Sequence, residues 1–502
     1  MATDIKPFTK RQIINAWCMY DWANSAFATT ILAAVLPVYY SQVAGSTLSS
    51  EAVATAYWSL GLSLSLLIVA IISPILGTIS DVVRGKKRFL TIFAVMGIVG
   101  TGLMVLVDTG DWLLASILFV LARIGFTSAN VFYDALLPHV AAAEERDQVS
   151  ARGYAMGYLG GGLLLAANAA MIAFLPGTWG PRLSFLSVAI WWALFSIPIL
   201  RRVPEPPAAT AASTSGASVV SVSLRRLAEV LKDIHRYKEL FKFLIAFLIY
   251  NDAIGTIIGV ATIYGAELGF DSTQLVLALL LVQFVGIPFS LIFGRLPSKS
   301  ETRRPYYLAF VVYNLVALPL VGAAGARLLP EDNLGVVLGL IAAVEAVGAA
   351  FAALLGRPLF SGLVATFDTR RSIVLSLIVY SVIAVWGYFL NSVVEFWLLA
   401  WMVAIVQGGS QALSRSLYAS LSPTAKSGEF FGLFGVMEKF SAILGPLLFA
   451  AAVGIFGNSR PAILSLILFF IIGILLLRNV NIEDGIRIAR EEDARSGLSA
   501  DT

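Results

Sequence analysis

The sequence predicts an all-α membrane protein of two helical bundles, with about fourteen transmembrane helices that form a twelve-helix core plus an inserted pair. Three observations predict this fold class: an apolar composition, a one-sided distribution of basic residues, and a repeat that relates two halves. Of the 502 residues, 58% are hydrophobic and 13% are charged, whereas a soluble domain carries about a quarter charged residues. The surplus apolar surface must therefore face lipid.

Apolar segments of about 20 residues, which suffice to cross a bilayer as helices, recur along the whole chain. The first is too long, and too interrupted by Asp21 and Asn24, for a cleavable signal peptide, so we expect a retained first helix. The predicted spans lie near 17–40, 57–79, 89–107, 113–137, 153–174, 183–200, 243–264, 273–294, 306–325, 335–356, 373–390, 397–420, 431–456 and 462–477.

Lysine and arginine gather on one side of this series of spans. The opposite side holds Arg182, Arg327 and Arg460, whereas clusters such as 84–88 and 225–242 fall on the first side. Because basic loops stay on the cytosolic side, we expect an integral, multi-pass protein of the plasma (inner) membrane with both termini cytosolic. The net charge of +4 reflects these loops and does not indicate a nucleic-acid partner.

The chain divides into four predicted parts. Residues 1–202 form a six-helix bundle, and 203–241 a cytosolic linker rich in Pro, Ala, Ser and Thr. Residues 242–480 form a second bundle with two extra helices at about 306–356, and 481–502 a cytosolic tail. The linker ends in a predicted amphipathic helix whose apolar positions are Leu224, Leu227, Val230, Leu231 and Ile234.

An internal repeat relates the two bundles. Tyr133-Asp134-Ala135-Leu136-Leu137-Pro138 ends the fourth span, and Tyr418-Ala419-Ser420-Leu421-Ser422-Pro423 ends the twelfth. Tyr20-Asp21 in the first span recurs loosely as Tyr250-Asn251-Asp252 in the seventh. Two related helical halves around a central pathway are typical of secondary transporters.

The first span carries a carboxylate and an amide on one face. Asp21 and Asn24 share this face with Ser25, Ala28 and Thr29. An aspartate within a membrane helix costs about 2.5–3.5 kcal/mol on insertion scales, so it must face protein or water. The alternative is that Asp21 is a solvated residue at the edge of the membrane or one member of a structural ion pair.

Further polar residues within the predicted spans complete a candidate pathway for substrate and coupling ion. Arg123 lies near the middle of the fourth span, where a buried guanidinium needs a carboxylate as its ion-pair partner. In the empty protein we expect this partner to be Asp21 or Asp252. The alternative is a set of ion pairs that fix helix register. The candidate residues are Asp21, Asn24, Arg123, Asn130, Asp252, Gln407, Gln411 and Arg415.

The short charged turn after the second span is a candidate gating loop. Gly77, Asp81 and Arg84 are its candidate residues, and a basic cluster follows them. Asp81 is placed to pair with a neighbouring helix end and so to latch the cytosolic side. The turn could equally be only a topology signal.

Two other features predict packing. Glycines at 153, 157, 160, 161 and 162 indicate a helix that approaches a neighbour closely. Glu345, in the middle of the inserted pair, should face a neighbouring helix and not lipid.

Several classes of function are excluded by the sequence. The single cysteine, Cys18, and the isolated His139 and His235 provide neither an intrachain disulfide nor a ligand-spaced metal site, so we expect no metal and no cofactor. No phosphate-binding Gly-x4-Gly-Lys-Ser/Thr run occurs, which argues against an ATP-driven pump. We expect no enzymatic activity.

The motifs resemble those of the major facilitator superfamily. The Gly77–Arg88 loop and its echo at Gly362–Arg371 resemble the superfamily pattern. Tyr20–Phe27, Gln407–Ser416 and Ile443–Phe449 resemble its branch of vacuole-effluxer-like proteins, related to the autophagy-associated amino-acid effluxers of fungal vacuoles. The resemblance covers nearly all of 12–480 and implies alternating access, with neutral amino acids as one candidate substrate class. The fourteen spans and the displaced glycine after Asp81 depart from the usual pattern.

Taken with the residues, the resemblance leads to one functional expectation. We expect a secondary active transporter of a small solute, such as an amino acid, that works by alternating access and is coupled to protons through a membrane carboxylate. Its expected partners are the solute, protons and the lipid bilayer, and a monomer should suffice. The alternatives are a non-transporting membrane receptor, a channel-like protein, or efflux of an unrelated apolar compound.

Overall fold

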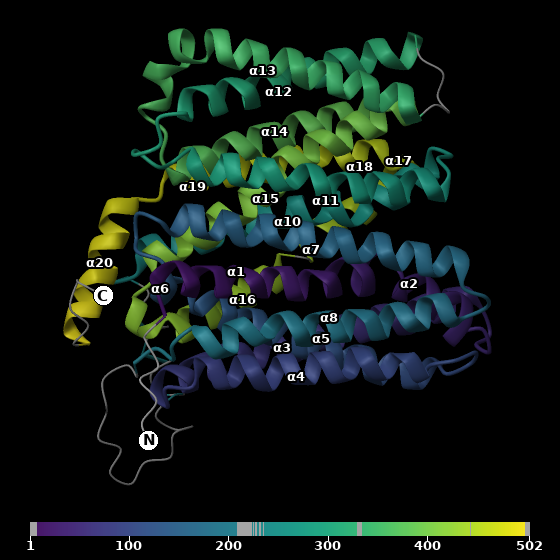
Figure 1. Cartoon of the computed structure of the whole chain (residues 1–502), viewed down its shortest axis with the longest axis horizontal. Coiled ribbons are helices and arrows are strands. Elements are labelled where there is room, and N and C mark those ends of the chain that lie inside the picture. The colour runs from purple at the N-terminus through teal and green to yellow at the C-terminus, as the bar shows by residue number, and fades with distance from the viewer. Residues whose placement is uncertain are drawn as a thin grey trace.

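Apolar helices that lie side by side along one common direction make up the molecule (Figure 1). The computed structural model describes residues 8–207, 223, 225, 228, 229, 232, 233, 235–328, 334–441 and 443–496. Within these residues, 13 helices are long and apolar enough to cross a membrane, or 14 if the bent pair Lys10–Ala34 and Leu36–Ala44 is one span. The prediction of an all-α membrane fold with about fourteen helices is confirmed.

The first half of the chain forms one bundle, coloured purple to blue in Figure 1. Its last helix ends at Arg202, the end of the first bundle in the sequence prediction. The elements are α1 (Lys10–Ala26), η1 (Phe27–Ala34), α2 (Leu36–Tyr39), η2 (Tyr40–Ala44), α3 (Glu51–Val82), α4 (Lys86–Leu103), η3 (Met104–Leu106), α5 (Trp112–Ala135), α6 (Leu137–Val140), α7 (Arg146–Phe174) and α8 (Trp179–Arg202).

The second half forms the other bundle, coloured teal to yellow. It begins at Lys238, four residues before the predicted start at 242. The elements are α10 (Lys238–Glu267), α11 (Ser272–Arg295), α12 (Arg304–Leu328), α13 (Leu334–Val364), α14 (Thr369–Phe389), α15 (Val393–Leu421), η4 (Thr424–Lys426), α16 (Ser427–Phe440), α17 (Leu444–Phe456), α18 (Arg460–Ser465), α19 (Ile467–Arg478) and α20 (Ile482–Arg495).

The inserted pair lies at the outer edge of the second bundle, where α12 and α13 form the top of Figure 1. The two helices pack against each other, and α12 also packs against α15. Nδ2 of Asn314 in α12 donates to Oε2 of Glu345 in α13 over 3.3 Å, so Glu345 faces a neighbouring helix as expected. The pair extends over 304–364, beyond the predicted 306–356.

Both described ends of the chain lie at the same end of the bundles, on the left of Figure 1. We call this the basic end, because the lysine- and arginine-rich turns meet there. Lys10 pairs with Glu145, and Lys426 pairs with Glu492 over 2.7 Å. At the opposite end, Arg182 pairs with Asp108 over 2.8 Å.

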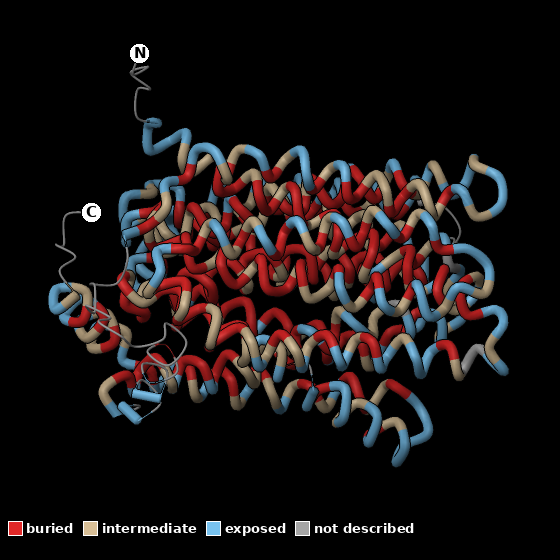
Figure 2. The backbone as a smooth tube through the Cα atoms, turned by 90° about the horizontal axis from the view of Figure 1, so that it is seen from below, coloured by how far each residue is buried: buried red, intermediate tan, exposed pale blue. Residues whose placement is uncertain are grey.

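The outward faces of the helices are apolar, as a lipid environment requires. Leu67 and Ile71 of α3, Ile117 of α5 and Leu354 of α13 are more than half exposed. Figure 2 shows the exposed residues on the outside and the buried ones along the centre of the molecule. A surface of this kind is stable in lipid and not in water.

The first predicted span is broken. α1 continues into the π-helix η1, in which the amide of Val35 donates to the carbonyl of Thr30 over 2.8 Å. Pro37 follows at once and has no amide hydrogen to donate, so the chain bends by 41° before α2. Hydropathy alone does not show such a break.

The predicted span 431–456 is also broken, between α16 and α17. Pro446 lies in the first turn of α17 and cannot donate a hydrogen bond to the preceding turn. Oδ2 of Asp252 in α10 instead accepts a hydrogen bond from the amide of Gly445 over 2.8 Å. Asp252 therefore holds the start of the second piece.

The predicted tail, residues 481–502, is described as far as residue 496. Residues 482–495 form α20, which lies across the basic end (Figure 1). Oδ1 and Oδ2 of Asp493 accept the amides of Ala425 over 2.8 Å and Thr424 over 3.0 Å. The predicted amphipathic helix through Leu224, Leu227, Val230, Leu231 and Ile234 lies outside the described residues.

The glycine run of α7 approaches a neighbouring helix closely, as predicted, and that helix is α1. A Cβ at Gly157 would lie 2.5 Å from Oγ of Ser25, and one at Gly160 would lie 2.4 Å from the carbonyl oxygen of Trp22. Real Cβ contacts of this length are essentially never seen, so only glycine permits this approach. The polar face of α1 is thereby held against α7.

Candidate functional site

A buried arginine connects the two bundles near the basic end. Arg415 belongs to α15, the most buried of the described spans, and its side chain is 4% exposed. It reaches across to α1, α5 and α7 of the first bundle. The site is therefore built at the boundary between the two halves of the chain.

Two carboxylates of the first bundle bind this one guanidinium. Nη1 of Arg415 lies 3.0 Å from Oδ1 of Asp134 in α5, and Nη2 lies 3.3 Å from Oδ2 of Asp21 in α1. The side chains of Asp21 and Asp134 are 12% and 18% exposed. We call these three residues the Arg415 cluster.

Ser150 of α7 accepts two further hydrogen bonds from Arg415. Nε donates to Oγ of Ser150 over 2.9 Å, and Nη2 donates to its carbonyl oxygen over 3.0 Å. The hydroxyl of Ser150 in turn donates to the carbonyl oxygen of Ala412 over 2.7 Å. The guanidinium is thus held by three helices of the first bundle at once.

Aromatic rings surround the cluster. The Cζ atom of Arg415 lies 4.5 Å from the ring centre of Tyr154, 4.8 Å from that of Trp17 and 5.5 Å from that of Tyr133. These distances permit cation–π attraction. The hydroxyl of Tyr133 also donates to Oδ2 of Asp21 over 2.7 Å.

The sequence makes room for the cluster at one glycine. A Cβ at Gly153 would lie 2.4 Å from Oδ2 of Asp21 and 3.1 Å from Nη2 of Arg415. Any larger residue would push the carboxylate and the guanidinium apart. Gly153 is therefore part of the site, although it carries no functional group.

Two carboxylates and one guanidinium leave the cluster with one negative charge if both aspartates are ionised. Removing one partner of a buried ion pair typically costs about 3–5 kcal/mol, because a charge is left uncompensated. If α15 withdraws from the first bundle, Asp21 and Asp134 lose their cation together. At least one of them must then meet water or bind a proton.

The candidate gating residue Asp81 forms a second contact between the bundles. Its Oδ1 and Oδ2 accept the amides of Gly428 over 3.1 Å and Glu429 over 2.8 Å, at the first turn of α16. A carboxylate at a helix N-terminus is favourable, since the amides there have no partner within the helix. The predicted contact of Asp81 with a neighbouring helix end is thus present.

The other two gating residues have different roles. A Cβ at Gly77 would lie 2.1 Å from the carbonyl oxygen of Gly428, so Gly77 lets α3 and α16 touch. Lys86 is the buried cation that pairs with Asp81. Arg84 is exposed, has a φ of 54°, and forms no ion pair among the described residues. A role of Arg84 in gating stays a prediction.

The start of α7 forms a third contact. Oδ2 of Asp147 accepts the hydroxyl of Thr369 over 2.8 Å, and its Oδ1 accepts the hydroxyl of Ser416. Nη1 of Arg146 donates to the carbonyl oxygen of Ala419 over 3.2 Å. Thr369 belongs to the loop that echoes 77–88 in the sequence, so both related loops join the bundles at the basic end.

The remaining candidates fall into two groups. Nδ2 of Asn24 donates to Oδ1 of Asn130 over 2.7 Å, so the structure brings this pair together. Gln407 and Gln411 of α15 are partly exposed, and their side-chain amides form no hydrogen bond with another described residue. These amides are free to bind a polar molecule.

Arg123 does not form the expected ion pair. Asp21 binds Arg415, and Asp252 binds the backbone of Gly445. Nε of Arg123 is buried without a hydrogen-bond partner among the described residues. The negative charge that acts on Arg123 belongs to Glu438 of α16. The structure thus leaves one buried donor of the Arg123 guanidinium unsatisfied among the described residues.

The predicted site residues include Asp21 but not the other partners of Arg415, Asp134 and Ser150. Asp134 lies on the same polar face of α5 as Arg123 and Asn130, and this spacing could have identified it. Ser150 and Asp147 gave no such signal, because a serine or an aspartate near the start of a helix is commonplace. Their importance follows from contacts between distant parts of the chain.

The fold and this site define a class, the multi-pass membrane transporters of the major facilitator type. The solved proton:xylose symporter XylE matches with a TM-score of 0.58 and 16% identity, over 94% of this chain and 96% of that chain. The human organic anion transporter MFSD10 matches with a TM-score of 0.60 and 13% identity, over 94% of this chain and all of that chain. At such identities the likeness shows the fold.

Sequence comparisons show the family. Residues 46–345 and 336–490 match the family described as "Vacuole effluxer Atg22 like". The MFS-type transporter YxiO of Bacillus subtilis is 32% identical over 97% of this chain and 99% of its own length. Autophagy-related protein 22 of Yarrowia lipolytica is 25% identical over 84% of this chain and 75% of its own. The chain belongs to the vacuole effluxer Atg22-like family of transporters.

Proposed function

We propose that this protein is a secondary active transporter that exports a small solute by alternating access, and that the Arg415 cluster closes one side of the pathway. The observation that carries the proposal is a buried arginine of the second bundle bound by two aspartates of the first. A contact of this kind has to break when the bundles separate. The cluster therefore couples the ionisation of two carboxylates to the state of the pathway.

We assign the basic end to the cytosol and the protein to the plasma membrane. The lysine- and arginine-rich turns support this orientation. The contacts of Arg415, Asp81 and Asp147 then all lie on the cytosolic side, and this conformation is closed there. The twelve-helix core is complete within one chain, which is consistent with a functional monomer.

Proton coupling follows from the charge balance of the cluster. When the cytosolic side opens, Arg415 of α15 moves away from Asp21 and Asp134. Without their shared cation the two carboxylates repel each other, which favours the uptake of a proton by one of them. When Arg415 returns, its charge favours the ionised form of both aspartates, so a bound proton is released. The protonation of Asp21 and Asp134 is thus linked to the opening and closing of the cytosolic side.

Polar groups deeper in the bundles suit an amino acid. The guanidinium of Arg123 is available for the carboxylate of the solute, and Glu438, which also pairs with Lys439, supplies a negative charge for its ammonium group. Gln407 and Gln411 offer neutral donors and acceptors between them. The family description as an effluxer favours export. In this account Asp252 stabilises the break in the span and does not bind the solute.

Proteoliposomes containing the full-length chain test the proposal. Vesicles loaded with a neutral amino acid should show counterflow of the labelled compound, and a pH gradient should drive net movement. Arg415→Gln should abolish net transport, whereas Arg201→Gln, a change of an exposed arginine at the basic end, should not. A receptor would move nothing, and a channel would conduct without saturation or counterflow.

A further inference from the structure

A pocket at the basic end is lined by residues of both bundles, and none of the three residues of the Arg415 cluster is among them. It has a volume of about 590 Å³, within the range of sites that hold small ligands. The face of α7 between Glu145 and Leu159 forms its floor, and α1 and α11 form its walls. The lining residues are Arg11, Ile14, Glu145, Gln148, Val149, Arg152, Ala155, Met156, Leu159, Ile287, Leu291 and Arg295.

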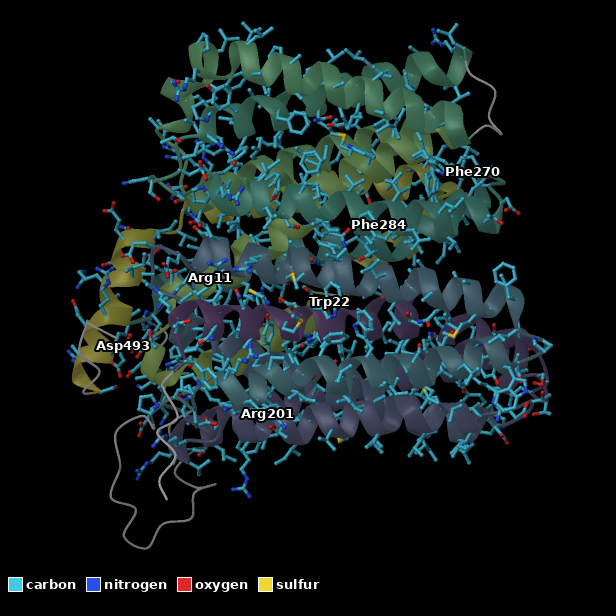
Figure 3. All side chains as sticks on the ribbon, viewed as in Figure 1. Arg11, Trp22, Arg201, Phe270, Phe284 and Asp493 are labelled. Carbon is cyan, nitrogen blue, oxygen red and sulfur yellow. The ribbon has the colours of Figure 1, made fainter. Side chains whose placement is uncertain are left out.

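The lining changes from charged to apolar in the same direction on all three helices. On α1, Arg11 precedes Ile14; on α7, Arg152 precedes Leu159; and Arg295 ends α11, with Leu291 one turn further into the bundle. In each case the arginine lies closer to the basic end. In Figure 3, Arg11 lies near that end, whereas Phe284 of α11 lies further along the bundle.

The positive charge of the pocket is not neutralised by the protein. Arg11, Arg152 and Arg295 form no ion pair with a carboxylate among the described residues. Glu145 is the acidic residue of the lining, and it is already paired with Lys10. Nη1 of Arg295 lies 3.4 Å from the hydroxyl of Tyr307, which orients this side chain without changing its charge.

We propose that this pocket binds one anionic phospholipid of the leaflet on the basic-end side, with its phosphate between the three arginines and one acyl chain along the apolar part. The arginines match a phosphate geometrically, since guanidinium groups bind phosphate through paired hydrogen bonds. The apolar part explains why the ligand is a lipid and not a soluble anion. Basic pockets between membrane helices are suited to such headgroups.

The bound lipid would contact both bundles. Arg152 belongs to α7 of the first bundle and Arg295 to α11 of the second. The two helices touch nearby, where a Cβ at Gly294 would lie 2.2 Å from Cβ of Ala151. A headgroup at this position therefore bridges the boundary that separates when the cytosolic side opens.

Lipid titration of the purified full-length chain, followed by native mass spectrometry, tests the proposal. The probe is phosphatidylglycerol, compared with phosphatidylcholine of the same chains. Each arginine should contribute about a fivefold gain in affinity for an anionic headgroup, so combined Arg11→Gln, Arg152→Gln and Arg295→Gln should weaken phosphatidylglycerol binding at least tenfold. The matched control changes three exposed arginines at the same end, Arg88→Gln, Arg201→Gln and Arg202→Gln, and should stay within twofold of the unmodified protein.

Two further measurements separate the alternatives. Arg152→Gln alone should weaken binding about fivefold, which keeps the test valid if the triple variant folds poorly. Leu159→Trp, which fills the apolar part, should reduce lipid binding while all three arginines remain. The proposal is overturned if the control variant loses as much affinity as the pocket variant. It is also overturned if inorganic phosphate displaces the lipid at equal concentration, which would indicate a soluble-anion site.

Discussion

Replacing Gly153 with alanine should open the cytosolic side without removing any charged group. The new Cβ would lie 2.4 Å from Oδ2 of Asp21, about 1 Å inside ordinary van der Waals contact. Asp21 has to move away by that amount, and its 3.3 Å contact with Nη2 of Arg415 then exceeds hydrogen-bonding distance. The bonds of Arg415 to Asp134 and Ser150 remain.

The size of the effect follows from the bond that is lost. A hydrogen bond between charged groups contributes about 1.5–3 kcal/mol, so the closed state should lose at least about tenfold in population relative to the open state. Gly255→Ala is the matched control, because a Cβ at Gly255 meets nothing within 4 Å. Both substitutions add the same methyl group to a membrane helix.

Labelling of one buried cysteine measures this opening. Ala412 of α15 is fully buried against α7, so Ala412→Cys in a Cys18→Ser background should react with a membrane-impermeant maleimide only when the bundles separate. In inverted vesicles, Gly153→Ala should raise the labelling rate at least tenfold, and Gly255→Ala should leave it unchanged. Equal rates in the two variants would refute the argument that the Asp21–Arg415 contact holds this side closed.

Three other predictions follow from the contacts at the basic end and in the pathway. Asp81→Asn should lower the maximal transport rate with little change in half-saturation, because its carboxylate binds the amides at the start of α16; Arg84→Gln should leave both constants unchanged in the same proteoliposome assay. Arg123→Ala should abolish transport of a carboxylate-bearing solute, as measured by counterflow, because the guanidinium of Arg123 is the proposed partner of the solute carboxylate. Burial alone would raise the pKa of Glu492, but its hydrogen bond with Lys426 and the neighbouring positive charges hold this pKa below its usual value. Its ionised form therefore stabilises the docking of α20 above about pH 4.5, and this contribution is lost as the pH falls through the lowered pKa; hydrogen exchange of α20 should show this loss, and Glu492→Gln should remove its pH dependence.

The helices could be predicted from the sequence because bilayer thickness fixes their length and apolar composition. The bend at 27–37 and the interruption between α16 and α17 could not, since π-helical turns and an amide bound by Asp252 leave hydropathy unchanged. The close approach of the α7 glycines to a neighbour was predictable, because spaced glycines have few other uses in a membrane helix, but α1 as that neighbour was not.

The sequence identified several residues of the site, but it did not show which of them contact each other. Polar positions in apolar spans identified Asp21, Asn24, Asn130 and Arg415 as candidates. Helical periodicity shows which face a residue occupies, but it does not show which helix that face meets. Arg123 was therefore expected to pair with Asp21 or Asp252, whereas Asp21 binds Arg415 from the other bundle and Asp252 binds the amide of Gly445.

A reversible cross-link between the bundles tests the central claim most directly. A Cβ at Gly435 of α16 would lie 2.9 Å from Cγ2 of Val131 in α5, so cysteines at positions 131 and 435 fall within reach of a disulfide, for which Cβ atoms lie about 3.5–4.5 Å apart. In the Cys18→Ser background, the oxidised protein should lose transport and regain it on reduction, while each single-cysteine variant stays active under oxidation. Full transport by the cross-linked protein would contradict alternating access through separation of the bundles at the basic end.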